Sequence, residues 1–112
     1  MPRVVVRVHP AAAEEAEAAY DWYAERSITA AQGFLEELGR AVEVVSETPG
    51  RWPQYRVGTR RYIFPRFPYF LVYRLLNDRV EVVAVARVLA LAIAARHLNF
   101  LVSVFRYDER YR

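Results

Sequence analysis

The first part of the chain combines a short apolar run with a stretch of helical spacing. Residues 3–8 are rich in β-branched side chains and end at His9-Pro10. Proline fits the first turn of a helix because that position needs no N–H partner. The pattern therefore predicts a strand that leads directly into a helix. The apolar positions expected to face the core from this helix are Ala13, Ala16, Tyr20 and Tyr23.

A second helix is expected soon after Ser27. Thr29 and Gln32 have the spacing of a capping box, in which each side chain accepts a hydrogen bond from the backbone N–H of the other. The apolar positions that follow recur at i, i+3, i+4 and i+7 until Pro49-Gly50 interrupts them. They are Ala31, Phe34, Leu35, Leu38, Ala41, Val42 and Val45. Two consecutive antiparallel helices follow from this pattern.

The second half of the chain has the residue preferences of strands. Residues 62–64, 69–76 and 80–86 are rich in β-branched and aromatic side chains, and Asn77-Asp78 marks a tight turn between the last two. The predicted order is β-α-α-β-β-β. It defines an α+β fold in which two antiparallel helices pack on one face of an antiparallel sheet. We expect residues 1–87 to form the main domain and residues 88–112 to be an atypical C-terminal extension of it.

Residues 88–105 are apolar enough to raise the question of a membrane span. Arg96, His97 and Asn99 interrupt them at positions where a membrane-spanning helix would be strongly disfavoured. The N-terminal valine run is too short for a signal peptide. These features predict a cytoplasmic protein that does not insert into a membrane.

Composition narrows the function by exclusion. A chain of 112 residues, 54% apolar and 26% charged, fits one globular domain. It has no cysteine, its two histidines lie at opposite ends, and its four glycines are scattered singly. A thiolate or histidine metal site and a glycine-rich phosphate loop are therefore not expected. The sequence predicts neither a metal nor a cofactor.

The net charge of +3 conceals a strong difference between the two halves. Residues 1–50 contain four arginines and nine acidic residues, whereas residues 51–112 contain twelve arginines and four acidic residues. Residues 51–74 contain no acid, so their positive field should attract a phosphate backbone or an acidic protein segment. Aromatic residues between these arginines either stack on nucleobases or serve as ordinary strand residues. The basic half is the expected contact surface.

Three segments together resemble a known family. "HPAAAEEAEAAYDWYAERS", "TPGRWP" and "RRYIFPRFPYFLVYRL" occur in the order and spacing typical of the RelE/ParE superfamily of bacterial toxins, closest to its ParE-like branch, over about residues 3–86. The resemblance implies a growth-inhibiting toxin of a type II toxin–antitoxin system, of the kind associated with plasmid stabilisation. It also implies a cognate antitoxin with an acidic, partly disordered tail that folds on binding. Either a homodimer or a toxin–antitoxin hetero-oligomer is compatible with it.

The superfamily contains two mechanisms, and the resemblance leaves both open. RelE-like members cut messenger RNA on the ribosome, which here would rest on Arg61 and Arg87 as electrostatic catalysts. ParE-like members inhibit DNA gyrase by binding. The lysines and the late tyrosine of RelE-like sites have no clear counterpart, which favours the gyrase mechanism and no enzymatic role. The expected contact residues for the target or antitoxin are Arg60, Arg61, Arg66, Tyr69, Tyr73 and Arg74.

The C-terminal sequence departs from both branches. After Arg87 the chain continues as "VLALAIAARHLNFLVSVFRYDERYR", without the ending common in the family. Residues 88–105 would be an extra element that covers an open sheet face, a surface for self-association, or the product of a shifted reading frame. A degenerate homologue that only binds antitoxin therefore remains a third hypothesis.

Overall fold

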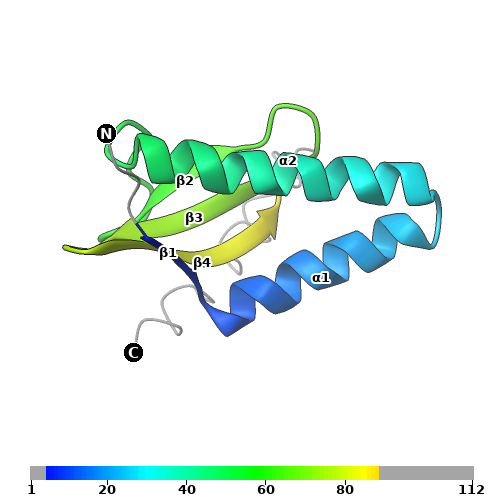
Figure 1. The fold of residues 1–112 in the computed structure, drawn as a ribbon, viewed down its shortest axis with the longest axis horizontal. Coiled ribbons are helices and arrows are strands. Elements are labelled where there is room, and N and C mark those ends of the chain that lie inside the picture. The colour runs from blue at the N-terminus through cyan, green and yellow to red at the C-terminus, as the bar shows by residue number, and fades with distance from the viewer. Residues whose placement is uncertain (1–4, 89–112) are drawn as a thin grey trace, which may run out of the picture.

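The computed structural model describes residues 5–88, which form two helices and four strands (Figure 1). Along the chain these are β1 (Val5–Val8), α1 (Pro10–Ala24), α2 (Ile28–Glu47), β2 (Arg60–Ile63), β3 (Tyr69–Leu75) and β4 (Arg79–Arg87). The predicted α+β class and the β-α-α-β-β-β order are confirmed. The three alternatives for residues 88–105 concern a segment that, apart from its first residue, lies outside the described residues.

The four strands form one sheet in the order β1-β4-β3-β2. The pairs β2–β3 and β3–β4 are antiparallel, whereas β1 runs parallel to β4 with Val5 beside Arg79. The sheet is therefore mixed. The α1–α2 hairpin carries the chain from β1 at one edge of the sheet to β2 at the opposite edge. Both helices lie on the same face of the sheet (Figure 1). We call this the helix-side face and the opposite one the second face.

Helix α1 begins as the sequence predicted, at Pro10. His9 caps it, since its Nδ1 accepts a hydrogen bond from the Ala11 N–H at 3.0 Å. Ala12 and Ala19 are the buried residues, while Ala13 is exposed. The predicted stripe was thus wrong at Ala13, because the buried face is centred one position earlier. Ala16, Tyr20 and Tyr23 do pack against the core as partly buried residues.

Helix α2 starts one residue after Ser27 and not at the predicted capping box. The Ser27 hydroxyl accepts a hydrogen bond from the Ala30 N–H at 3.2 Å, and the extended backbone of Ser27 makes it the cap. Thr29 and Gln32 are both exposed on the helix. The capping-box prediction was therefore wrong in residue but right in place, since a helix does start in this short segment.

The core lies between the helices and the helix-side face of the sheet. From α2 it contains Ala31, Phe34, Ala41 and Val45, and from the sheet Leu71, Tyr73, Val80 and Val82. Leu35, expected among the core positions, is instead 53% exposed. The Phe34 ring is the centre of an aromatic cluster, with centroid distances of 5.1–6.1 Å to four other rings.

Tyr73 joins the sheet to the end of α2. Its side chain is fully buried, and its hydroxyl donates a hydrogen bond to the Pro49 carbonyl oxygen at 2.6 Å. Burial raises the pKa of Tyr73 to about 12, although the nearby Arg60 opposes this rise. The phenol therefore stays neutral and holds the loop after α2 against the sheet.

The second face carries a separate apolar cluster. Phe70, Val72, Val83 and Ala84 are buried there, with Tyr55, Ala86 and Val88 partly buried against them. The strand alternation that sends Leu71 and Tyr73 toward the helices sends Phe70 and Val72 to this side. The two sides of β3 are therefore both apolar.

Strand β4 is nine residues long and β1 only four, so part of β4 extends past its neighbour. His9 and Glu15, at the start of α1, form hydrogen bonds with backbone groups of β4 along this edge. The His9 N–H donates to the Val82 carbonyl oxygen at 2.8 Å, and the Glu15 carboxylate accepts from the Val85 N–H at 2.9 Å. Glu15 thus takes the place that a backbone carbonyl of a longer β1 would fill.

Candidate partner-binding surface

Four of the arginines within residues 5–88 lie at one edge of the sheet. Strand β2 is the edge strand, and the loop 51–59 runs along it: the Arg61 N–H donates to the Pro53 carbonyl oxygen at 3.1 Å, and Gln54 forms a bridge with Arg60. We call β2 together with this loop the basic edge. It contains Arg51, Arg56, Arg60 and Arg61.

A tight turn gives the loop of the basic edge its shape. The buried Thr59 hydroxyl accepts a hydrogen bond from the Arg56 N–H at 2.9 Å and donates to the Arg56 carbonyl oxygen. Gly58 adopts φ +73°, a conformation that glycine accepts without strain. This turn holds the Arg56 backbone close to the start of β2.

Arg60 and Arg61 point to opposite faces of the sheet. Arg60 aligns with Tyr73 on the helix-side face, and its guanidinium donates to the Trp52 carbonyl oxygen at 2.6 Å. Arg61 aligns with Val72 on the second face, with its guanidinium 5.4 Å from the Tyr55 ring centroid. Within residues 5–88, no carboxylate forms a salt bridge with either of them. Both keep their positive charge available at the edge.

Arg66 is placed differently, because it is bound to a buried acid. The Glu37 carboxylate, 3% exposed, accepts hydrogen bonds from the Arg66 N–H at 2.7 Å, the Phe67 N–H at 3.0 Å and Arg66 Nε at 2.9 Å. Burial would raise the pKa of Glu37, but these hydrogen bonds and the Arg66 charge together hold it below its ordinary value. Glu37 therefore fixes the loop between β2 and β3 to α2.

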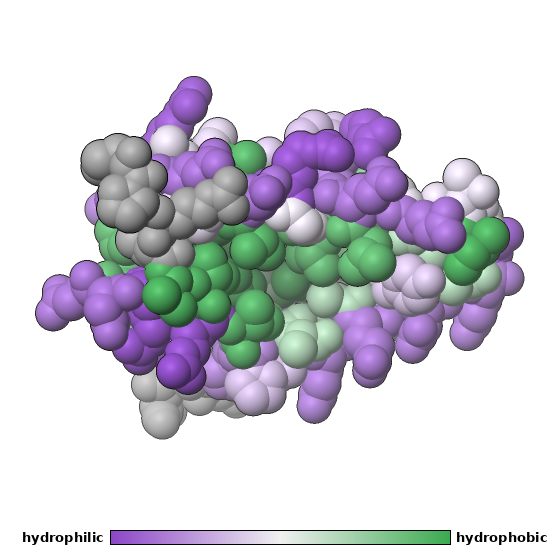
Figure 2. All heavy atoms as spheres, viewed as in Figure 1, coloured by the Kyte–Doolittle hydropathy of each residue, from purple (hydrophilic) through white to green (hydrophobic). Residues whose placement is uncertain are grey.

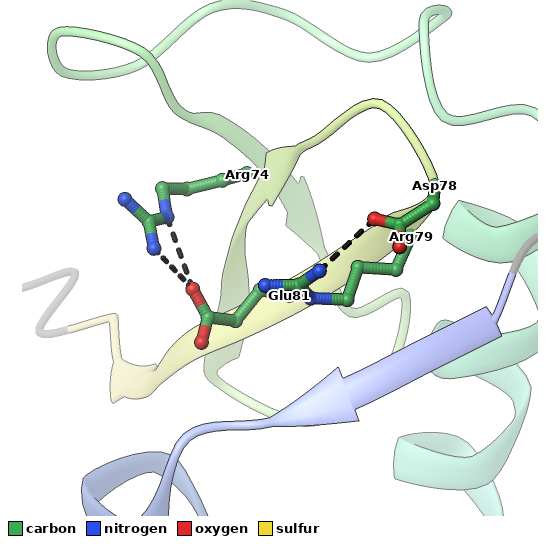
Figure 3. Close-up of polar contacts among 4 residues, drawn as sticks. All are labelled: Arg74, Asp78, Arg79 and Glu81. Atoms are coloured by element: carbon green, nitrogen blue, oxygen red, sulfur yellow. Dashed lines mark hydrogen bonds and ion pairs between the residues drawn. The ribbon is translucent and has the colours of Figure 1, made fainter.

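Arg74 is also paired with an acid. It lies on the second face opposite Glu81, and its guanidinium binds that carboxylate through two nitrogens (Figure 3). In the same view Arg79 donates to the preceding residue, Asp78, at 2.9 Å, where the turn between β3 and β4 ends. Much of the charge at this end of the hairpin is compensated, so the local field is weaker than the sequence implied.

Tyr69 and Tyr73 lie in the core, which corrects the expectation that they stand beside the arginines at the surface. Tyr69 is 8% exposed and Tyr73 is fully buried. Burial raises the pKa of Tyr69, and the neighbouring Tyr23 raises it further. The sequence showed the alternation of β3 but not which of its sides the helices cover.

The structure separates the two arginines proposed as catalysts. Arg61 points to the second face, whereas Arg87 pairs with Tyr69 on the helix-side face. The Arg87 guanidinium lies 5.5 Å from the ring centroid of Trp22, which is 41% exposed. A shared phosphate could not contact both arginines across the sheet. The pair expected for a ribonuclease is therefore not assembled.

Trp22 and Arg26 form a cation–π pair that sequence reasoning did not single out. The Arg26 guanidinium lies 3.8 Å from the Trp22 ring centroid and donates to the Trp22 carbonyl oxygen at 2.7 Å. The i, i+4 spacing of the two residues on α1 was the available signal. The pair covers part of the ring and leaves the other part to solvent.

An apolar band crosses the face of the molecule that Figure 2 shows, between α1 and α2 and on to β1, with hydrophilic side chains around it. Val5 and Val8 of β1 are 62% and 49% exposed. Val6, Leu38 and Val42 are partly buried against the core from the same elements. Exposed apolar surface of this kind commonly marks a site of protein–protein contact.

Among the described residues, no group of three or more His, Cys, Asp or Glu side chains lies close enough to hold a metal ion. None of the helices within residues 5–88 has the length and hydropathy to cross a membrane.

The fold is that of a small α+β protein with a basic edge, and its sequence matches a known family. Residues 6–89 match the family model described as ParE toxin of type II toxin-antitoxin system, parDE, so the chain belongs to this toxin family. A solved structure described as a chromosomal ParDE TA system from P. aeruginosa has the same fold, with a TM-score of 0.69 and 18% identity. The match covers 77% of this chain and 97% of that one. No protein with a curated description matches.

Proposed function

We propose that this ParE-family chain is the toxin of a type II toxin–antitoxin pair, that a cognate antitoxin neutralises it, and that it arrests growth by binding DNA gyrase. The placement of Arg61 and Arg87 on opposite faces of the sheet carries the choice of mechanism. Ribonuclease chemistry needs cationic groups that converge on one phosphate. A toxin that acts by binding needs a complementary contact surface and no such convergence on one phosphate.

Two surfaces support an antitoxin as the partner. The apolar band beside β1 suits the apolar side chains of a segment that folds on contact. The basic edge suits acidic side chains of the same segment, because Arg60 and Arg61 have no acidic partner within residues 5–88. Arg66 and Arg74 contribute at the margins of this contact, since each already binds a carboxylate.

Purified full-length protein is expected to inhibit DNA supercoiling by gyrase and to increase cleaved gyrase–DNA complexes. Ribosomes carrying messenger RNA, incubated with the same protein, should show no cleavage at the codon in the A site. These two assays separate the mechanisms. Cleaved messenger RNA with normal supercoiling would contradict the proposal. Antitoxin binding with neither activity would support a homologue that has lost its toxicity.

Arg61→Glu is expected to weaken binding of the antitoxin encoded beside this gene by roughly 10- to 100-fold at low salt, because it places a negative charge where acidic side chains dock. The difference should shrink as ionic strength rises. Arg40→Glu, the same charge change at an exposed position of α2, is the matched control. Equal losses in the two variants would show that net charge and not the basic edge governs binding.

A further inference from the structure

The second face of the sheet is apolar although both helices lie on the other side. Phe70 is 6% exposed, Val83 is 1% exposed, and Val72 and Ala84 are fully buried. An antiparallel sheet with helices on one face usually places polar residues on its other face. Within residues 5–88, the Tyr55 ring is the large side chain that reaches this cluster from outside the strands, 5.6 Å from the Phe70 ring centroid. One ring is too small a cover for four buried residues.

The chain leaves β4 toward this face. Val88 follows the last residue of β4, and its N–H donates to the Pro68 carbonyl oxygen at 2.7 Å. The Val88 side chain is partly buried against the second-face cluster. The described chain therefore ends next to the apolar surface, so the segment that follows needs no long connection to reach it.

The sequence after Val88 is mostly apolar, as expected for a segment that packs on an apolar surface. Between residues 88 and 105 the polar residues are Arg96, His97, Asn99 and Ser103, and the others are apolar. The family model ends at residue 89, and the solved relative is 97% covered while matching only 77% of this chain. The segment is therefore an addition to the shared toxin domain.

We propose that residues 89–105 lie on the second face of the same molecule and cover Phe70, Val72 and Ala84. The segment buries its own apolar side chains and those of the sheet in one contact. This inference does not depend on the proposed function. It assigns the area over this apolar cluster to the chain itself, and it leaves the apolar band beside β1 and the guanidinium groups of Arg60 and Arg61 for partners.

Cysteine cross-linking tests the contact without background, because the natural sequence contains no cysteine. The anchor is Ile63→Cys on β2, at a position that pairs with Phe70 and is 54% exposed. The second cysteine is introduced in the full-length chain at one of the alanines of the segment. These are Ala90, Ala92, Ala94 and Ala95. Glu36→Cys, exposed on α2, is the control anchor with the same four positions.

We expect mild oxidation of dilute protein to form an intramolecular disulfide about tenfold faster with Ile63→Cys than with Glu36→Cys for at least one position, since a held segment has a higher effective concentration. Disulfides between two molecules would show that a second copy occupies the face. Equal rates at the two anchors, or no disulfide at either, would also overturn the proposal.

Thiol protection gives an independent measurement. In the full-length Ala84→Cys variant, we expect a maleimide reagent to label the thiol slowly in buffer and quickly in urea. Rapid labelling of a folded variant would mean that the face is uncovered. If the larger side chain prevents folding, the cross-linking experiment at Ile63 still decides the question.

Discussion

Replacing Glu37 with leucine is expected to lower the free energy of unfolding by about 3–5 kcal/mol. The substitution removes the acceptor for the Arg66 and Phe67 N–H groups and for Arg66 Nε, which lie 2.7–3.0 Å from the carboxylate. Most of the loss comes from the two backbone N–H groups. The ion pair itself contributes less, because the Arg66 side chain is 61% exposed and screened by solvent.

Urea denaturation followed by circular dichroism measures this loss. Glu36→Leu removes a carboxylate from the neighbouring, exposed position of α2, and should change the free energy of unfolding by no more than about 0.5 kcal/mol. The free energy should fall mainly in the Glu37 variant. Similar values for the two variants would show that the loop between β2 and β3 does not depend on Glu37.

The Glu37 carboxylate also makes the free energy of unfolding depend on pH. The pKa of Glu37 is lower in the folded protein than its ordinary value of 4.5, so the unfolded chain takes up the proton first as the pH falls. The stabilisation that ionised Glu37 provides is complete above the pKa of Glu37 in the unfolded chain. It is lost as the pH falls through the pKa of Glu37 in the folded protein. The difference in stability between the natural protein and Glu37→Leu should therefore narrow in acid.

Replacing Phe34 with alanine is expected to cost about 3–5 kcal/mol of stability. The ring is fully buried and contacts Tyr23, Phe64, Phe67 and Tyr69, so alanine would leave a cavity between α2 and the loop before β3. These ring contacts join α1, α2 and the sheet. Their loss should lower the midpoint of urea unfolding and leave the slope of the transition unchanged.

The adjacent residue provides the control for this substitution. Leu35 is 53% exposed, so Leu35→Ala removes a similar apolar side chain from the same helix with little loss of buried area. We expect a change below about 1 kcal/mol. A cost at Leu35 equal to that at Phe34 would show that burial in the aromatic cluster does not explain the effect, since alanine favours the helix at both positions.

The sequence predicted the elements well because their signals are local. Apolar periodicity and turn residues lie within a few positions of each other, so both helices and all four strands were expected within a few residues of their observed bounds. The parallel pairing of β1 with β4 was not expected. It joins residues from the two ends of the domain, and no local pattern records such a contact.

The surface was harder to predict than the fold, because it also depends on contacts between residues that are far apart in the sequence. The absence of acids from residues 51–74 suggested a set of uncompensated arginines. In the structure Arg66 binds Glu37 and Arg74 binds Glu81, and both acids lie outside that segment. Arg60 and Arg61 remain without a carboxylate partner within residues 5–88, because β2 is the edge strand. Strand alternation likewise could not tell that Tyr69 and Tyr73 face the helices.

The parallel pairing of β1 with β4 also sets the order of events during translation. The ribosome releases Val5–Val8 first, yet its partner Arg79–Arg87 comes last among the described elements. The valine-rich β1 segment therefore has no partner strand while the following elements are synthesised. Its pairing with β4 closes the longest loop of the described fold. The four-stranded sheet therefore cannot be completed until β4 has left the exit tunnel.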